Sequence, residues 1–471
     1  MANSLWVLTE ERPKKAVLAQ IVHKFVSEQG IAAFFDQIRI IPILDAELQF
    51  TAKYQIVGVT SPAFENIFLK IISGNSSFVD YLVFYQELEP TPNQIPMFAI
   101  EETKTSDSES RNTGVFQRAT KFVYIDVFYP DIDKTMLYNG ETELEALPTQ
   151  TNIFGTRCFL TLGVKFLGKD LESESFRPFG SIDELIAYKS KMRRPPAGNV
   201  PIDITRVSDE LITISGRLVK GGTLAHDPNI GALSLISAAL RILGWTRQIR
   251  IVQHGLTQSM VRPKNKFVQI ASFLKLELEE LTLPEAIYPE AYWRYESTGE
   301  KLGTIFVHLV VEGFTEGFSI YENHAGCERG YFYTADGNPL AVSKRVPDEE
   351  GKVAKDAEKI AIPDLLLVDV SRLQIINVEG ERAKNVLIGI EQLGTFGNIE
   401  RFYVNRYYPA YEVIRSVVLY GGESEEVHHI EVSILLNSFG AIILGISAPG
   451  LFREAVKNLL DFWKAGSLRV S

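Results

Sequence analysis

Two acidic residues and a lysine stand at the end of an apolar segment, where they are suited to bind a metal ion beside a phosphate. The segment reads FAIEETKTS over residues 98–106, so in an extended strand Glu102 and Lys104 share one face and Glu101 lies on the other. Upstream, SSFVDYLVFYQ contains Asp80 as its single acid. If the two strands pair, we expect Asp80 and Glu102 to converge on one divalent cation, with Lys104 beside it.

This combination of residues suits the hydrolysis of phosphodiester bonds. Mg²⁺ prefers oxygen ligands and retains several waters, so two carboxylates are enough to anchor it while a bound water attacks. The lysine would hold the phosphate or help to deprotonate the water if burial lowers its pKa. A solvated Glu102–Lys104 pair on an edge strand remains the structural alternative, because an acid followed two residues later by lysine is a common pattern.

The two segments together resemble the Asp…Glu-x-Lys signature of the PD-(D/E)xK nuclease superfamily. The stretch EETKTSDSESRNTGVFQRATKF is similar to sequences of type II restriction endonucleases. The resemblance implies a restriction-endonuclease-like core, in which Asp80 and Glu102 bind Mg²⁺ and Lys104 assists the attacking water.

The same resemblance implies two supporting residues. Members of the superfamily often carry a further acid on an upstream helix, here Glu65 in SPAFENIFLKI, and a polar residue on the following helix, here Gln117. One position departs from the pattern, since Val79 stands where a proline usually precedes the first acid.

A second segment has a similar layout. AIPDLLLVDVSRLQIINVEGERAK contains Pro363 and Asp364, then Glu379 and Glu381 at the end of an apolar strand, and Gln392 follows in a predicted helix. Glu381 takes the place of the usual lysine, so the activity of this site is open. Either common residues have produced the likeness by convergence, or the chain contains two nuclease-like domains, with one active site for each DNA strand.

The net charge of −11 conceals a local excess of positive charge. Residues 228–276 contain no Asp or Glu, and KSKMRRPP over 189–196 forms a second basic cluster. Such a face would attract a phosphate backbone, although scattered surface cations are the alternative. The predicted DNA-binding residues are Arg193, Arg194, Arg247, Arg250, Arg262, Lys264 and Lys266.

The 471 residues, 45% of them hydrophobic, indicate two or three domains of an α/β or α+β protein, with mixed β-sheets flanked by helices. We place an N-terminal nuclease-like lobe at 1–300, including a basic segment at about 180–276, and a C-terminal nuclease-like domain at 301–471. The apolar patterns predict strands at 81–86, 97–102, 122–129, 304–314 and 371–380, and helices at 14–30, 231–244 and 451–463.

The remaining sequence features indicate where in the cell we expect the protein. Two cysteines are too few for a disulfide framework, and the N-terminal residues lack the layout of a signal peptide, so we expect a cytoplasmic protein with no membrane segment. His428 and His429 are adjacent and point to opposite faces of a strand, so they do not form a metal site together.

The sequence therefore predicts a Mg²⁺-dependent, sequence-specific endonuclease that acts on double-stranded DNA, as a monomer with two sites or as a homodimer. Two alternatives remain. A structure-specific repair nuclease would cut flaps or junctions regardless of sequence, whereas a non-catalytic DNA-binding protein on a nuclease fold would bind DNA without cutting it.

Overall fold

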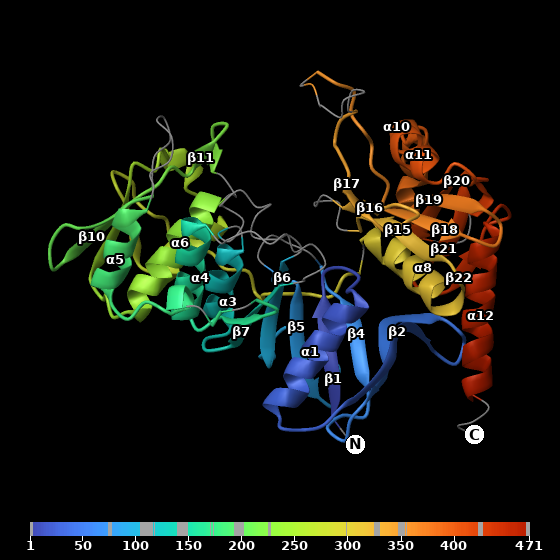
Figure 1. Ribbon diagram of the computed structural model, residues 1–471, viewed down its shortest axis with the longest axis horizontal. Helices are drawn as coiled ribbons and strands as arrows, with labels where there is room; N and C mark the ends of the chain where they lie inside the picture. The colour runs from blue at the N-terminus through green and yellow to red at the C-terminus, as the bar shows by residue number, and fades with distance from the viewer. Residues whose placement is uncertain are drawn as a thin grey trace. The chain divides into compact units, whose positions relative to one another are not determined.

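The computed structural model divides into two compact units (Figure 1). Unit 1 comprises Met1–Gly74, Gln86–Leu88 and Tyr295–Ser471, and unit 2 comprises Asn75–Tyr85 and Glu89–Arg294. The structure describes residues 3–73, 78–103, 116, 118–138, 149–169, 171–172, 174–192, 202–224, 228–297, 299–324, 330–346, 354, 356–422 and 427–467.

This division differs from the expected lobes at 1–300 and 301–471. The chain re-enters unit 1 at Tyr295, close to the expected boundary, but the first 74 residues also belong to unit 1. Long-range hydrogen bonds join them to the C-terminal part: the Phe50 amide donates to the Gly440 carbonyl at 2.8 Å, and the Trp463 indole donates to the Pro42 carbonyl at 2.9 Å. Contacts between segments this far apart in the chain cannot be predicted from the local sequence pattern.

Unit 1 contains four strands in the order β2-β3-β4-β1, with β1 parallel to β4 and the other pairs antiparallel. Helix α1 lies between β1 and β2 in the chain. The bounds are β1 Ser4–Thr9, α1 Lys15–Glu28, β2 Phe34–Leu44, β3 Phe50–Thr60 and β4 Ile67–Ile71.

Unit 1 also contains a six-stranded sheet in the order β15-β18-β19-β20-β21-β22 and a two-stranded sheet of β16 and β17. Strand β19 is antiparallel to β18 and parallel to β20, which is parallel to β21. Helices α8 and α9 pack on opposite faces, since a Cβ added at Gly380 would meet Thr304 of α8 whereas one added at Gly389 of α9 would meet the Glu381 side chain. The elements are α8 Lys301–Phe314, β15 Phe318–Glu322, β16 Tyr331–Tyr333, β17 Pro339–Ala341, β18 Leu365–Asp369, β19 Gln374–Arg382, α9 Val386–Leu393, α10 Gly397–Ile399, α11 Asn405–Tyr407, β20 Glu412–Tyr420, β21 Val432–Leu436, β22 Ile442–Leu444 and α12 Gly450–Ser467.

Unit 2 has four strands in the order β5-β6-β7-β8 and a second sheet in the order β14-β13-β10-β9. Strand β6 is antiparallel to β5 and parallel to β7, which is parallel to β8. The elements are β5 Tyr81–Gln86, β6 Phe98–Thr103, α3 Ala119–Phe128, β7 Asp133–Tyr138, α4 Gln150–Thr161, β8 Lys165–Leu167, α5 Ile182–Lys191, β9 Ile204–Arg206, β10 Leu211–Ser215, β11 Val219–Lys220, β12 Thr223–Leu224, α6 Pro228–Ile242, β13 Gln248–Val252, α7 Lys266–Phe273 and β14 Leu276–Leu278.

The structure confirms a mixed α/β protein with mixed sheets flanked by helices, as Figure 1 shows. The strands predicted at 81–86 and 97–102 and the three predicted helices are present. The strands predicted at 122–129 and 304–314 are wrong, because these segments lie in α3 and α8. Both are nearly continuous apolar runs, for which burial on all sides removes the periodicity that separates strand from helix.

None of the helices in the described ranges is both long and apolar enough to cross a bilayer.

Candidate carboxylate sites in the two units

In unit 2, Asp80 precedes β5 and lies against the end of β6. Its Oδ2 accepts a hydrogen bond of 2.7 Å from the Glu102 amide, while the Asp80 amide donates to Oε2 of Glu101 at 3.2 Å. The register pairs Tyr81 with Ile100, so one further step places Asp80 opposite Glu101. Opposed residues of antiparallel strands project from the same face, so the Asp80 and Glu101 carboxylates converge.

The prediction that Asp80 and Glu102 converge on one divalent cation is therefore wrong. The Glu102 side chain lies on the other face, where its Oε2 accepts a 2.9 Å hydrogen bond from the buried Tyr81 hydroxyl. The expected alternation along β6 is correct, but the pairing register assigns Asp80 to the face of Glu101. A shift of one residue in register exchanges the two faces of a strand.

A lysine does lie beside the two converging carboxylates, and it comes from helix α3. The Lys121 ammonium is 2.8 Å from Oε1 of Glu101 and 3.4 Å from Oδ1 of Asp80, and Arg118 lies 3.7 Å from Glu101. Burial and the Asp80 charge raise the pKa of Glu101 to about 8, against the opposing effect of the two cations. Glu101 therefore holds a proton or a cation readily near neutral pH.

The structure leaves two predicted residues of this site undescribed and places a third in unit 1. Lys104 and Gln117 lie outside the described residues. Glu65 belongs to unit 1, where it is exposed in a bend before β4 and its amide donates to the Asn3 carbonyl at 3.1 Å. It does not lie on a helix, so the expected helical position of this acid is wrong.

In unit 1, Asp364 precedes β18 and lies against the end of β19. Its Oδ2 accepts a 2.9 Å hydrogen bond from the Gly380 amide. A Cβ at Gly380 would lie 2.4 Å from the Thr304 methyl and 3.0 Å from the Asp364 carboxylate, so a side chain at this position would disrupt the approach. Glycine is thus required where the strand meets both α8 and Asp364.

Glu379 and Glu381 project from the opposite face of β19 to the one that Gly380 presents to α8. Burial, followed by the charges of Asp364, Glu381 and Glu300, raises the pKa of Glu379 to about 9. Burial is also the main cause that raises the pKa of Asp364 to about 7 and that of Glu381 above its usual value. The buried Oε2 of Glu379 has no hydrogen-bond partner among the described residues.

The Asp364 site therefore concentrates negative charge without a lysine among its described neighbours. Glu381 accepts a 3.4 Å hydrogen bond from the Asn385 side chain. Gln392 lies in α9 as predicted, and its buried Oε1 has no hydrogen-bond partner in the described part of the chain.

The two units repeat one local arrangement. An aspartate before one strand accepts the amide hydrogen of the residue after a glutamate, in Asp80–Glu102 and again in Asp364–Gly380. Both glutamates, Glu101 and Glu379, stand on a strand with an antiparallel neighbour on one side and a parallel neighbour on the other. On this alignment Thr103 corresponds to Glu381.

The acid-free stretch 228–276 does not make an acid-free surface. Strand pairing places Glu277 3.4 Å from Arg250, and Glu210 lies 3.4 Å from Arg247. Arg241 is structural, since it donates to four backbone carbonyls around the end of α6. Arg193 and Arg194 lie outside the described residues.

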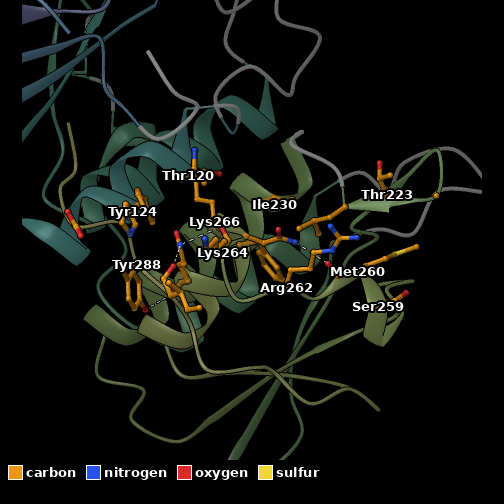
Figure 2. A pocket seen from close by; sticks show the side chains of 18 residues that line it. Thr120, Tyr124, Thr223, Ile230, Ser259, Met260, Arg262, Lys264, Lys266 and Tyr288 are labelled. Carbon is orange, nitrogen blue, oxygen red and sulfur yellow. Dashed lines mark hydrogen bonds between the residues drawn. The ribbon is translucent and has the colours of Figure 1, made fainter. Parts of the chain in front are cut away.

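Three of the predicted DNA-binding residues do gather, around a pocket of about 940 Å³ in unit 2. Figure 2 shows Arg262, Lys264 and Lys266 among its lining residues, together with Tyr124 and Tyr288. Arg262 and Lys264 form no ion pair with any described residue, and the Lys266 ammonium lies 5.8 Å from the centre of the Tyr124 ring. The pocket therefore offers positive charge beside aromatic rings.

Comparisons of the chain with protein-family models, curated proteins and solved structures found no match.

Sequence reasoning missed Glu101 and Lys121, and it also missed a buried cluster of His308, Glu322 and His324 in unit 1. The sequence partly indicated Glu101, because Glu101 is one of two adjacent acids at the end of the predicted strand. Lys121 stands twenty residues further along the chain from Glu101. Only the packing of α3 on β6 shows that the two meet.

Proposed function

We propose that this protein is a Mg²⁺-dependent endonuclease of the restriction type, with a restriction-endonuclease-like core in each unit. The observation that carries the proposal is the repeated carboxylate arrangement, Asp80 with Glu101 and Asp364 with Glu379. In each unit an aspartate accepts a hydrogen bond from the backbone amide of the residue that follows a glutamate, so each unit can supply one active site.

The donor sets fit Mg²⁺, which takes carboxylate oxygens and water. Asp80 and Glu101 would hold it in unit 2, and Asp364, Glu379 and Glu381 would hold it in unit 1. The Oε2 of Glu379, which has no described hydrogen-bond partner, and the raised pKa values of Asp364 and Glu379 support this assignment, because both carboxyls are buried beside other acids while the charge of Arg382 acts on Glu381. When bound, Mg²⁺ supplies charge to the phosphate oxygens and acidifies a bound water.

The residues of the chain have separate roles in the proposed reaction. The Glu102 and Gly380 amides hold Asp80 and Asp364 in place through hydrogen bonds of 2.7 and 2.9 Å. Lys121 takes the role expected of Lys104: its ammonium neutralises part of the charge of Asp80 and Glu101 and can donate to a phosphate oxygen. Unit 1 lacks such a lysine among the described neighbours of Glu379, so we expect its cleavage step to be slower.

Cleavage of supercoiled plasmid and viral DNA with and without Mg²⁺ tests the proposal. The unaltered protein is expected to give discrete linear fragments with Mg²⁺ only. Asp80→Asn and Asp364→Asn should each leave nicked circles as the main product, and the double variant should leave the DNA intact. Asparagine keeps an oxygen acceptor for the backbone amide, so these variants should retain the native circular dichroism spectrum.

Each of the other possible results of this experiment favours a different interpretation. The absence of Mg²⁺-dependent cleavage from a panel of DNAs, with DNA still bound, would favour the non-catalytic protein. Cleavage confined to flaps or junctions would favour the repair nuclease. Linear products from Asp80→Asn at the normal rate would remove unit 2 from catalysis.

The pocket in unit 2 leads to a prediction about DNA affinity. We expect the triple variant Arg262→Gln, Lys264→Gln, Lys266→Gln to weaken binding at least tenfold. It should also reduce the slope of log affinity against log salt by about 0.9 for each lost phosphate contact. Fluorescence anisotropy of a labelled duplex across a series of KCl concentrations, without Mg²⁺, measures both quantities.

A matched control comes from the same basic segment. Arg247 and Arg250 already pair with Glu210 and Glu277, so Arg247→Gln with Arg250→Gln should change the salt slope less than the triple variant does. Equal effects of the two variants would mean that general positive charge, and not the pocket, binds the DNA.

A further inference from the structure

Two buried histidines and a glutamate meet in unit 1, on the elements that precede the Asp364 site in the chain. His308 lies on α8, Glu322 ends β15, and His324 follows two residues later. The side chain of His308 is fully buried and that of His324 is 2% exposed, whereas Glu322 is 30% exposed. Neither histidine has a role in the proposed nuclease reaction.

One atom from each residue points to a common centre. Nδ1 of His308 is 2.9 Å from Nε2 of His324, and Oε2 of Glu322 is 3.5 Å from the first nitrogen and 4.0 Å from the second. A triangle with these sides has a centre about 2 Å from each corner, which is the length of Zn–N and Zn–O bonds. The three atoms are thus already spaced as ligands of one ion.

In both histidines, the ring nitrogen that faces away from the other histidine is held by a second residue. Nε2 of His308 lies 3.1 Å from the Glu312 carboxylate, and Nδ1 of His324 lies 2.9 Å from the Thr304 hydroxyl. Arg12 donates at 2.8 Å to Oε2 of Glu322, the same oxygen that faces the two histidines. Metal-binding histidines are characteristically oriented in this way, by a hydrogen bond from the ring nitrogen that does not face the metal.

The charges of the cluster also favour a cation. Glu312 and Glu322 are two buried or half-buried carboxylates around the single guanidinium of Arg12, and Lys15 nearby is exposed to solvent, which screens its charge.

We propose that His308, Glu322 and His324 bind one divalent transition-metal ion of the zinc class, separate from the Mg²⁺ sites. Imidazole nitrogens favour zinc and its neighbours over Mg²⁺, which prefers oxygen ligands. Three protein ligands leave a fourth tetrahedral position for water. The ion would fasten β15 to α8, and α8 in turn contacts Gly380 through Thr304.

Titration of the chelator-treated full chain with Co²⁺, a spectroscopic substitute for zinc, tests the site without reference to nuclease activity. We expect visible absorption bands of four-coordinate Co²⁺ that saturate at one ion per chain and disappear when Zn²⁺ is added. Zn²⁺ alone should raise the melting temperature of the protein by several degrees. His324→Ala and Glu322→Gln should each abolish the saturating band or weaken Co²⁺ binding at least tenfold.

The control is the double variant His428→Ala, His429→Ala, which removes two exposed histidines and should bind Co²⁺ as the unaltered protein does. Circular dichroism identifies any variant that has lost its fold, and Glu322→Gln, whose side chain is partly exposed, is the variant more expected to keep it. No band with Co²⁺, or an unchanged band in folded Glu322→Gln and His324→Ala, would overturn the proposal. Failure of the plasmid experiment would leave this result unaffected.

Discussion

Glu101→Gln should reduce DNA nicking by unit 2 about 100-fold or more, whereas Glu102→Gln should change it less than about threefold. Even residues that only orient a metal ligand cost about 10–100-fold in activity when they are changed. Glu101 faces Asp80 and Lys121, while Glu102 faces the Tyr81 hydroxyl on the other side of β6. The nicking rate of supercoiled plasmid, measured in an Asp364→Asn background, reports unit 2 alone.

The two variants form a matched pair, because both replace a buried glutamate on the same strand by its amide. Glutamine at 102 keeps an oxygen that can accept the hydrogen bond from Tyr81. If Glu102→Gln abolishes nicking while Glu101→Gln retains it, the metal ligand lies on the other face of β6. Lys121→Met offers an independent check, since it should lower nicking if this lysine replaces the one expected at 104.

Glu379→Gln should stabilise unit 1 at alkaline pH in the absence of metal. The pKa of Glu379 is raised from 4.5 to about 9, mainly by burial, so the folded state holds a proton that the unfolded chain has already lost. The free energy of unfolding therefore falls as pH rises from about 4.5 to about 9. Glutamine does not ionise, so the variant should be at least about 1 kcal/mol more stable than the unaltered protein near pH 9, which corresponds to about 2 °C or more in melting temperature.

Thermal unfolding followed by circular dichroism between pH 5 and pH 9 measures this difference. Near pH 5 the two proteins should melt together, because Glu379 is then largely protonated in the folded protein and its penalty is small. Saturating Mg²⁺ should reverse the order at alkaline pH, since the ion stabilises the carboxylate form that only the unaltered protein can supply. A variant less stable at every pH, with the Mg²⁺ response unchanged, would mean that Glu379 has a packing role and does not bind the ion.

Much of the local structure follows from the sequence pattern alone. The two apolar segments at 81–86 and 97–102 form the strands β5 and β6, and the helices near 14–30, 231–244 and 451–463 form as expected. The acids that stand at strand ends, Asp80 and Asp364, do meet the neighbouring strand. In these cases alternation of side chains and the burial of one face act over a few residues, which a local pattern can reveal.

The membership of each site depends on tertiary structure. Register selects Glu101 rather than Glu102 as the neighbour of Asp80, and the packing of helix α3 brings in Lys121. The cluster of His308, Glu322 and His324 likewise needs α8 to lie against β15. The sequence by itself determined which segments become strands or helices and which residue types are available for chemistry. The tertiary structure decided which of those residues meet, because strand register and helix packing are set by contacts between segments far apart in the chain.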